Sequence, residues 1–251
     1  MRASMAAELR GLLRGRRQGW VLVLAVAGSL AGGLTSGAIA AQVGSVGPLE
    51  LATMSVSRGA ATPIAVALLA ALAVAGPYRD GGWLHAVLGE PRALPRALAG
   101  AVPMLGLSLL LGLLSATIAA VSAAALVGFD LGALALAVSA HLLVTTIWSA
   151  WMLCLAHATR SPLATLAVGV GVPVIVEPAL AGLMAQLRLD PARWALPGQA
   201  LRAVGEVAAG GGAVLLPVPV GALAIAVAAI AACTLAAVLA AWLRMRAAQP
   251  R

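Results

Sequence analysis

The segment ALAGAVPMLGLSLLLGLLSATIAAVSAAALV, residues 97–127, contains no charged side chain. About 20 apolar residues in an α-helix cross the hydrocarbon core of a bilayer, which is about 30 Å thick. These 31 residues are therefore long enough to span a membrane and either to tilt strongly or to extend beyond it. The segment predicts a membrane-spanning helix, and the rest of the chain repeats its pattern.

Five other apolar segments accompany it, and polar segments separate them. We predict six spans, at about residues 20–41, 60–76, 97–127, 131–155, 163–184 and 220–242. A polar stretch at residues 42–59 follows the first span, and a longer external segment at residues 185–219 precedes the sixth. Within that external segment, Asp190 followed by Pro191 predicts the start of a short helix at the membrane surface.

The composition supports the same class of protein. Hydrophobic residues make up 62% of the chain, its mean hydropathy is +1.03, and charged residues make up only 10%. A soluble domain carries about 25% charged residues. A transmembrane β-barrel would show segments of about ten residues with alternating hydrophobicity, and the sequence has no such pattern. We therefore predict an all-α polytopic membrane protein in which residues 1–251 form a single transmembrane domain.

Arginine supplies all sixteen basic residues, and lysine is absent. Twelve arginines flank the predicted spans on one side of the membrane: Arg2, Arg10, Arg14, Arg16, Arg17, Arg79, Arg92, Arg96, Arg160, Arg244, Arg246 and Arg251. The other side has four: Arg58, Arg188, Arg193 and Arg202. Because cytoplasmic loops carry the excess of basic residues, we predict that both termini are cytoplasmic. The arginines form no basic face with interleaved aromatic residues, so a nucleic-acid partner is not expected.

The residue types also exclude several kinds of chemistry. A P-loop ATPase needs a lysine on the phosphates, so any ATP-driven work must come from another subunit. Cys154 and Cys233 lie inside apolar segments and are interpreted as small hydrophobic residues. His141 and His157 are too far apart for a metal pair, and no acid or cysteine joins them. We expect no metal site, and without a nucleophile–base set we expect no enzymatic activity on this chain.

Residues 1–19 show a basic and an apolar stripe. Leu9, Leu12 and Leu13 fall on one helical face, and Arg10 and Arg14 fall on the other. This pattern predicts an amphipathic helix that lies in the membrane interface and leads into the first span. The alternative interpretation is a solvated basic leader.

The first span carries two overlapping pairs of glycines with GxxxG spacing. Gly28 pairs with Gly32, and Gly33 pairs with Gly37. Small residues at this spacing let two helices approach closely in a membrane. In a chain so rich in glycine and alanine, the same spacing also arises by chance, so both interpretations stay open.

A compact polar insertion, PYRDGGWLHAVLGEPRALPR at residues 77–96, separates the second and third spans. Asp80 predicts a helix N-cap, and Gly89 followed by Pro91 predicts the helix end. The residues Trp83, Leu84, Val87 and Leu88 share one face. A helix of about two turns is not stable alone in water, so it needs either the bilayer surface or a groove on a partner protein.

This insertion resembles the first cytoplasmic loop of the membrane (permease) subunits of type-2 (ABC-2 class) bacterial ABC exporters. The matching positions are Tyr78, Arg79, Gly81, Leu84, Leu88, Pro91 and the nearby arginines. Pro77, Gly82 and Gly100 depart from the pattern, which usually has glutamate, threonine and lysine there. The stretches VPVIVEPALAGLM, residues 172–184, and RWALPGQALRAVG, residues 193–205, also resemble the class.

The resemblance implies six spans, cytoplasmic termini and a location in the bacterial cytoplasmic membrane. It implies that the helix at residues 80–89 is a coupling helix seated in a groove of a separate ATPase subunit. The residues assigned to this coupling are Tyr78, Arg79, Asp80, Gly81, Gly82, Trp83, Leu84, Val87, Leu88, Glu90, Pro91 and Arg92. No cofactor is expected on this chain, and ATP and Mg²⁺ would bind the ATPase.

The same resemblance implies a complex of two ATPase subunits and two permease copies, expected as a homodimer. The first span, with Gly28, Gly32, Gly33 and Gly37, would lie near the contact between the copies. The cargo expected from the apolar interior of the spans is a lipophilic drug or antibiotic, a lipid or a hydrophobic peptide, moved outward.

Three residues inside the spans are candidates for the transport path. Glu177 is an acid well inside the fifth span, where a charge must face protein or water. It is either an outer gate or substrate contact, or a structural acid bound to a neighbouring helix or to an arginine of the external segment. Trp148 and Trp151 share a face of the fourth span and serve either packing or substrate stacking.

Two other functions compete with the exporter. An ATP-independent secondary transporter usually has several charges within its spans, and here only Glu177 is evident. A non-transporting membrane anchor or sensor would not need the docking helix. Co-purification with an ATPase separates these alternatives.

Overall fold

The computed structural model describes residues 16–44, 46–59, 61–79, 81, 93–128, 130–209 and 220–247. Every regular element in these ranges is a helix. Six helical segments are long and apolar enough to cross a membrane: Gly19–Val43, Thr62–Arg79, Gly100–Val127, Leu131–Thr159, Pro162–Gln186 and Gly221–Ala247. The prediction of an all-helical chain with six apolar helices long enough to span a membrane is therefore confirmed for the described residues. The helix expected at residues 1–19 lies almost wholly outside them.

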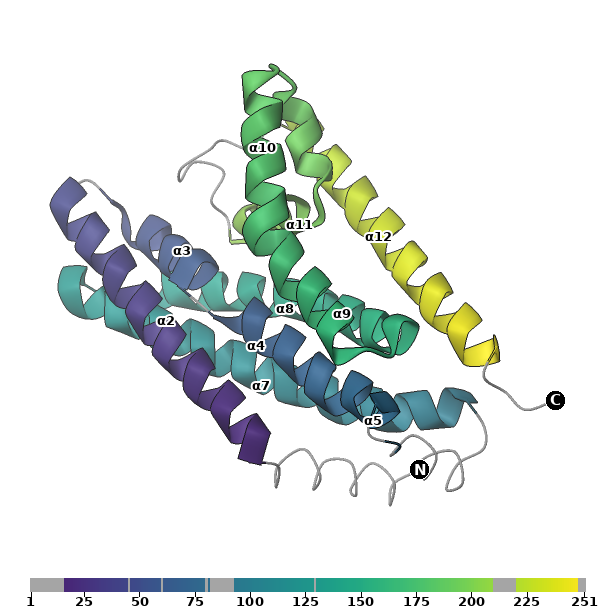
Figure 1. Ribbon diagram of the computed structural model, residues 1–251. Helices are drawn as coiled ribbons and strands as arrows, with labels where there is room; N and C mark the ends of the chain where they lie inside the picture. Colours follow the sequence, from purple (N-terminus) through teal and green to yellow (C-terminus); the bar gives the residue numbers. More distant parts are fainter. Residues whose placement is uncertain are drawn as a thin grey trace.

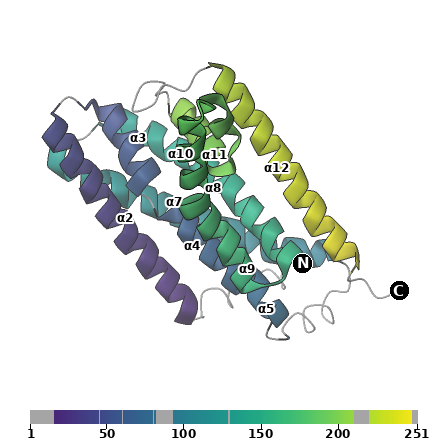
Figure 2. The same ribbon diagram turned by 45° about the horizontal axis from the view of Figure 1, so that its top comes forward.

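The first and third spans pack along each other. Helix α2 (Arg16–Val43) lies beside α7 (Ala93–Val127) in both ribbon views (Figures 1 and 2). Their contact uses small residues, because a Cβ atom on Gly33 would collide with the backbone of Ala119. A Cβ atom on Gly37 would come within 2.8 Å of the Ala123 carbonyl oxygen. The glycines thus allow two helix backbones to touch.

The second span is the most buried of the six. It consists of α4 (Thr62–Leu69), a π-helical segment η1 (Ala70–Ala75) and α5 (Gly76–Arg79). The span therefore continues three residues beyond the predicted end at residue 76. Leu69 and Val66 lie in its core, against α7 and α8 (Leu131–Thr159).

The turn between α7 and α8 forms where the sequence predicts it. Gly128 has φ +121°, in the region that favours glycine. The Asp130 carboxylate accepts a hydrogen bond from the Ala133 N–H at 2.6 Å and caps α8. At its other end α8 stops at Arg160, whose φ is 53°.

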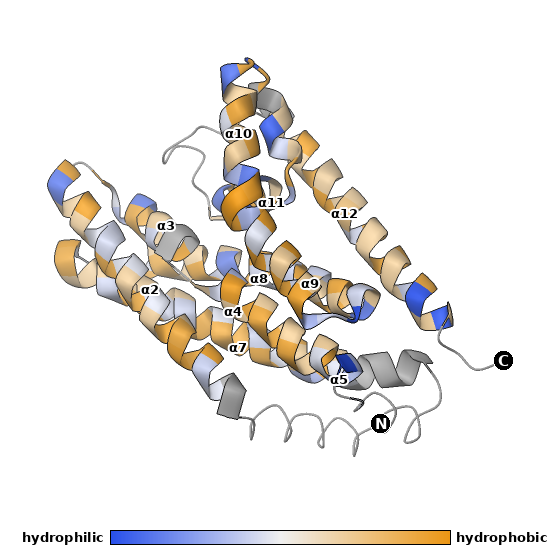
Figure 3. Cartoon of the chain, viewed as in Figure 1, coloured by the Kyte–Doolittle hydropathy of each residue, from blue (hydrophilic) through white to orange (hydrophobic). Residues whose placement is uncertain are grey.

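The fifth and sixth spans lie at the periphery and expose most of their residues. The fifth consists of α9 (Pro162–Leu166), the π-helical η2 (Ala167–Val176) and α10 (Glu177–Gln186). Pro173 within η2 cannot donate a backbone hydrogen bond, which favours a local change of helix type. Helix α12 (Val220–Ala247) forms the flank opposite α2 (Figures 1 and 2). Apolar residues cover most of both spans (Figure 3), as a lipid-facing surface requires.

Two polar segments fold into the bundle instead of lying on a surface. Helix α3 (Pro48–Gly59), from the polar stretch at 42–59, buries residues 51–56 against α2, α7 and α8. Helix α11 (Pro197–Ala208), from the external segment, buries Leu201 and its neighbours and packs on α8 and α12. The short helix predicted to start at Asp190 is observed as a 3₁₀ helix, η3 (Asp190–Ala195), which precedes α11 and has Leu189 as its N-cap residue.

The alternating spans define two ends of the bundle. One is named the α11 end: α2 finishes there, and α3 and α11 lie there. The other is named the α5 end: α5 and α8 finish there, and α7 begins there.

Candidate functional site

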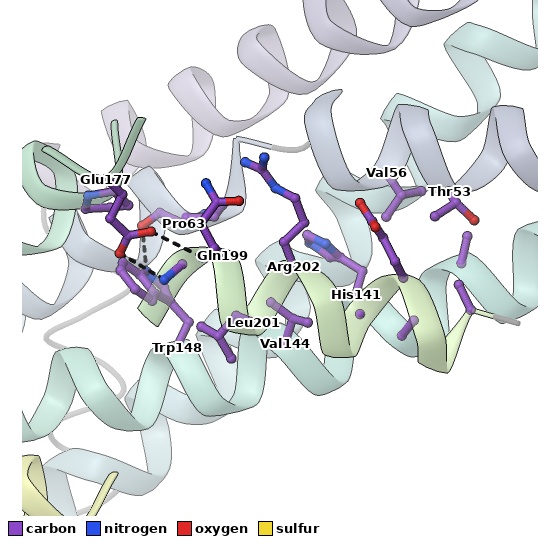
Figure 4. Close-up of a pocket in the computed structure, with 17 residues that line it drawn as sticks. Thr53, Val56, Pro63, His141, Val144, Trp148, Glu177, Gln199, Leu201 and Arg202 are labelled. Atoms are coloured by element: carbon purple, nitrogen blue, oxygen red, sulfur yellow. Dashed lines mark hydrogen bonds between the residues drawn. The ribbon is translucent and has the colours of Figure 1, made fainter. Parts of the chain in front are cut away.

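A cavity of about 160 Å³ lies between α3, α8, η2 and α11 (Figure 4). Most of its surface is apolar and comes from residues such as Val56, Ala140 and Val144. Six of its lining side chains are polar or charged: Thr53, His141, Glu177, Gln199, Arg202 and Glu206. The two segments that fold into the bundle, α3 and α11, therefore create a mixed cavity at the α11 end.

Glu177 lies at one end of this cavity and is only 3% exposed. Its Oε1 accepts a hydrogen bond from the Gly198 N–H at 2.9 Å, and its Oε2 accepts one from the Gln199 N–H at 3.2 Å (Figure 4). The partner of Glu177 is therefore the backbone of the segment at residues 185–219. The sequence had left an arginine of that segment open as one possible partner. Glu177 combines a structural contact with a place on the cavity wall.

This contact satisfies both partners. The first N–H groups of a helix have no acceptor within the helix, and Leu196, the N-cap residue of α11, has no side chain that could accept them. The Glu177 carboxylate supplies the missing acceptors and lies at the positive end of the α11 dipole. In return, two hydrogen bonds offset the cost of burying a carboxylate.

The contact also shows how deeply α11 enters the bundle. Glu177 precedes the end of α10 by nine residues, or about 14 Å at 1.5 Å per residue. The chain therefore turns back after Gln186 and starts α11 within the length of the fifth span. Non-helical backbone at such depth is tolerated where protein buries it or where it lines a cavity, and the start of α11 lines the cavity at Gly198 and Gln199.

His141 lines the cavity and belongs to a buried polar pair. The Thr62 hydroxyl and His141 Nε2 are 2.9 Å apart and join the start of α4 to α8. Thr53 on α3 is also buried, but its hydroxyl has no hydrogen-bond partner among the described residues. Unpaired buried hydroxyls are uncommon, so Thr53 marks a place with unused hydrogen-bonding capacity on the cavity wall.

The two tryptophans pack between spans. The Trp148 indole N–H donates to the Pro63 carbonyl oxygen at 3.1 Å, and that of Trp151 donates to the Thr234 hydroxyl at 2.8 Å. Their rings meet edge to face at 6.1 Å, and both are buried. Trp151 lies away from the cavity and has a packing role, whereas Trp148 also forms part of the cavity wall.

A second polar cluster lies at the α5 end. The Tyr78 hydroxyl is 3.1 Å from His157 Nδ1, and the Arg160 guanidinium lies 5.4 Å from the centre of the Tyr78 ring. Arg160 Nη2 also donates to the Arg244 carbonyl oxygen at 2.6 Å. This cluster connects the last residues of α5 to the ends of α8 and α12.

Three of the predicted coupling residues are described. Tyr78 belongs to the cluster above, Arg79 is the exposed last residue of α5, and Gly81 is exposed with φ +78°, as a sharp exit from the span requires. The others lie outside the described residues: Asp80, Gly82, Trp83, Leu84, Val87, Leu88, Glu90, Pro91 and Arg92.

The small face of the first span makes its close contacts within the chain. Gly33 and Gly37 pack on α7, and a Cβ atom on Gly28 would come within 2.8 Å of the Ala61 Cβ atom. Gly32 is partly buried on the same helix. Packing of these glycines between two copies stays a prediction.

Within the described ranges, no group of three or more histidine, cysteine and acidic residues is placed to hold a metal ion. The chain matches no protein-family model, and no curated protein matches it significantly.

Proposed function

We propose that this chain is the permease subunit of an ABC exporter, which moves a lipophilic molecule outward across a bacterial cytoplasmic membrane. A separate ATPase subunit would bind the loop at residues 77–96 and supply the energy. The support is the combination of six apolar helices, a polar loop with a docking-helix pattern after the second, and the complete absence of lysine. In this proposal the α5 end is cytoplasmic and the α11 end faces outward.

The observation that carries the proposal furthest is the contact network at the base of the loop. Tyr78 contacts His157 and Arg160, and Arg160 contacts the backbone of Arg244. A displacement of the loop by an ATPase would therefore act directly on the ends of α8 and α12. Those two helices also pack against α11, which covers the cavity.

The outer gate in this proposal is α11. It separates the cavity from α12, and the Glu177 carboxylate holds its first turn. Movement of α8 and α12 would shift α11 and open the cavity outward, while the Glu177 contact would restore the closed position.

The test is co-purification followed by an activity assay. Tagged chain from its native membrane should carry with it an ATPase with a Walker lysine, and the complex in proteoliposomes should hydrolyse ATP. Trp83→Glu places a charge on the apolar face of the docking helix and should abolish co-purification. Leu187→Glu, at an exposed residue of the α11 end, is the matched control and should leave it intact.

Each other result contradicts the proposal. If no ATPase is recovered with the chain, or if the Trp83→Glu variant recovers as much ATPase as the unchanged chain, the exporter proposal is wrong. Solute movement that a proton gradient drives without ATP would instead establish a secondary transporter. A chain that moves no solute under either condition would be a membrane anchor or sensor.

A further inference from the structure

We propose that the cavity beneath α11 is a binding site for a compact organic ammonium ion, a protonated amine with one ring or a short apolar chain. Binding is a property of this chain alone. The step from bound ligand to exported substrate rests on the proposed function.

The size of the cavity limits the ligand. An apolar cavity of about 150 Å³ in a folded protein takes up a benzene molecule, and the cavity here is of similar volume, about 160 Å³. Ala137, Ala140 and Val144 of α8 provide an apolar wall, and Trp148 adds an aromatic ring. A single ring with a short polar substituent fits this space.

The charges that line the cavity favour a cation. Two carboxylates, Glu177 and Glu206, stand against one guanidinium, Arg202. Arg202 is exposed, so water screens its charge, whereas Glu177 is 3% exposed and its charge acts at close range. The N-terminus of α11 offsets roughly half of one negative charge. The excess of negative charge attracts an ammonium group and repels a carboxylate.

Hydrogen-bonding capacity remains for such a ligand. Each Glu177 oxygen accepts one N–H from α11, although a carboxylate accepts about four hydrogen bonds in total. The buried Thr53 hydroxyl has no hydrogen-bond partner among the described residues, and it lines the same cavity. An ammonium group has three donors, so it can use acceptors that the chain leaves unsatisfied.

The experiment measures binding to the purified full chain without ATP or an ATPase. Three one-ring probes of similar size differ in charge: benzylamine hydrochloride, benzyl alcohol and sodium benzoate. Each is titrated at neutral pH while thermal unfolding is followed by maleimide labelling of Cys154 and Cys233, which are both half-buried in the folded chain. The rise in melting temperature with ligand concentration yields each dissociation constant.

We expect benzylammonium to bind at least about tenfold more tightly than benzyl alcohol. One charge-assisted hydrogen bond accounts for a difference in affinity of this size. Benzoate should produce no shift. Glu177→Gln should remove the preference for benzylammonium over benzyl alcohol, and Glu50→Gln should not, because Glu50 is an acid of α3 that does not line the cavity. Ala140→Leu fills the cavity and should abolish binding of all probes.

Thr53→Val keeps the inference testable if Glu177→Gln does not fold. Loss of an unpaired buried hydroxyl should not lower the melting temperature of the empty chain, while benzylammonium should bind several-fold more weakly. Tighter binding of benzoate, equal binding of amine and alcohol, or binding that survives Ala140→Leu would each overturn the inference. Those results would leave the exporter proposal standing, because they do not involve the ATPase.

Discussion

At the scale of single residues, Glu177 and Gly198 depend on each other. Glu177 supplies the acceptors that the start of α11 lacks, and Gly198 leaves room for the carboxylate, since a Cβ atom there would collide with Glu177 Oε2. A buried acid in a span usually indicates a functional site. Here the acid also positions a helix, so its loss should affect folding as well as function.

Gly198→Ala should destabilise the chain by about 1–3 kcal/mol, because the new methyl group must push the carboxylate away from the backbone. Gly182→Ala is the control, since a Cβ atom there meets nothing within 4 Å and alanine favours a helix by about 1 kcal/mol. Unfolding in mixed micelles measures both. Equal stability of the two variants would show that Glu177 does not hold α11 as described.

At the scale of elements, the contact between α2 and α7 depends on the absence of side chains. Gly33 and Gly37 face the backbone of α7 at Ala119 and Ala123. Within lipid, association of helices comes from close packing rather than from exclusion of water. A methyl group that pushes α2 and α7 apart should therefore weaken the contact along the whole length of the two helices.

Gly33→Ala should lower the free energy of unfolding by about 1–3 kcal/mol, since rigid backbone atoms block the new methyl group. Gly106→Ala on α7 has open space around its Cβ position and should be neutral or slightly stabilising. Chemical unfolding of the two variants in the same detergent provides the comparison. A harmless Gly33→Ala would mean that α2 and α7 are not packed at this register.

At the scale of the whole molecule, the arrangement of charge predicts which end faces the cytoplasm. The described residues include seven arginines at the α5 end and four at the α11 end. Those at the α5 end are Arg16, Arg17, Arg79, Arg96, Arg160, Arg244 and Arg246, and those at the α11 end are Arg58, Arg188, Arg193 and Arg202. Basic residues flanking spans stay on the cytoplasmic side. We therefore predict that the cavity and α11 face outward.

Single cysteines test this orientation in a background with Cys154 and Cys233 replaced by serine. Leu187→Cys at the α11 end and Ala247→Cys at the α5 end both lie at exposed positions. In intact cells an impermeant maleimide should label Leu187→Cys, and it should reach Ala247→Cys only after permeabilisation. The reverse pattern would place both termini outside.

Much of the fold is predictable from the sequence because it depends on local properties. Six apolar segments of sufficient length predict six helices, and the gap between the predicted spans 97–127 and 131–155 predicts the place of the turn before α8. The presence of an acid, Glu177, within the fifth apolar segment can also be read from the sequence. The burial of α3 and α11 cannot be read from the sequence, because an amphipathic polar helix suits a membrane surface as well as a bundle interior.

The all-helical class of this chain and its six apolar helices of membrane-spanning length can be read from the sequence alone. Helix length and hydropathy decide these features without reference to distant residues. The packing of the helices was needed to show that Glu177 binds the backbone amides of Gly198 and Gln199, and that Tyr78 contacts His157. Backbone amides carry no side-chain signal, and contacts 21 or 79 residues apart depend on how the helices pack.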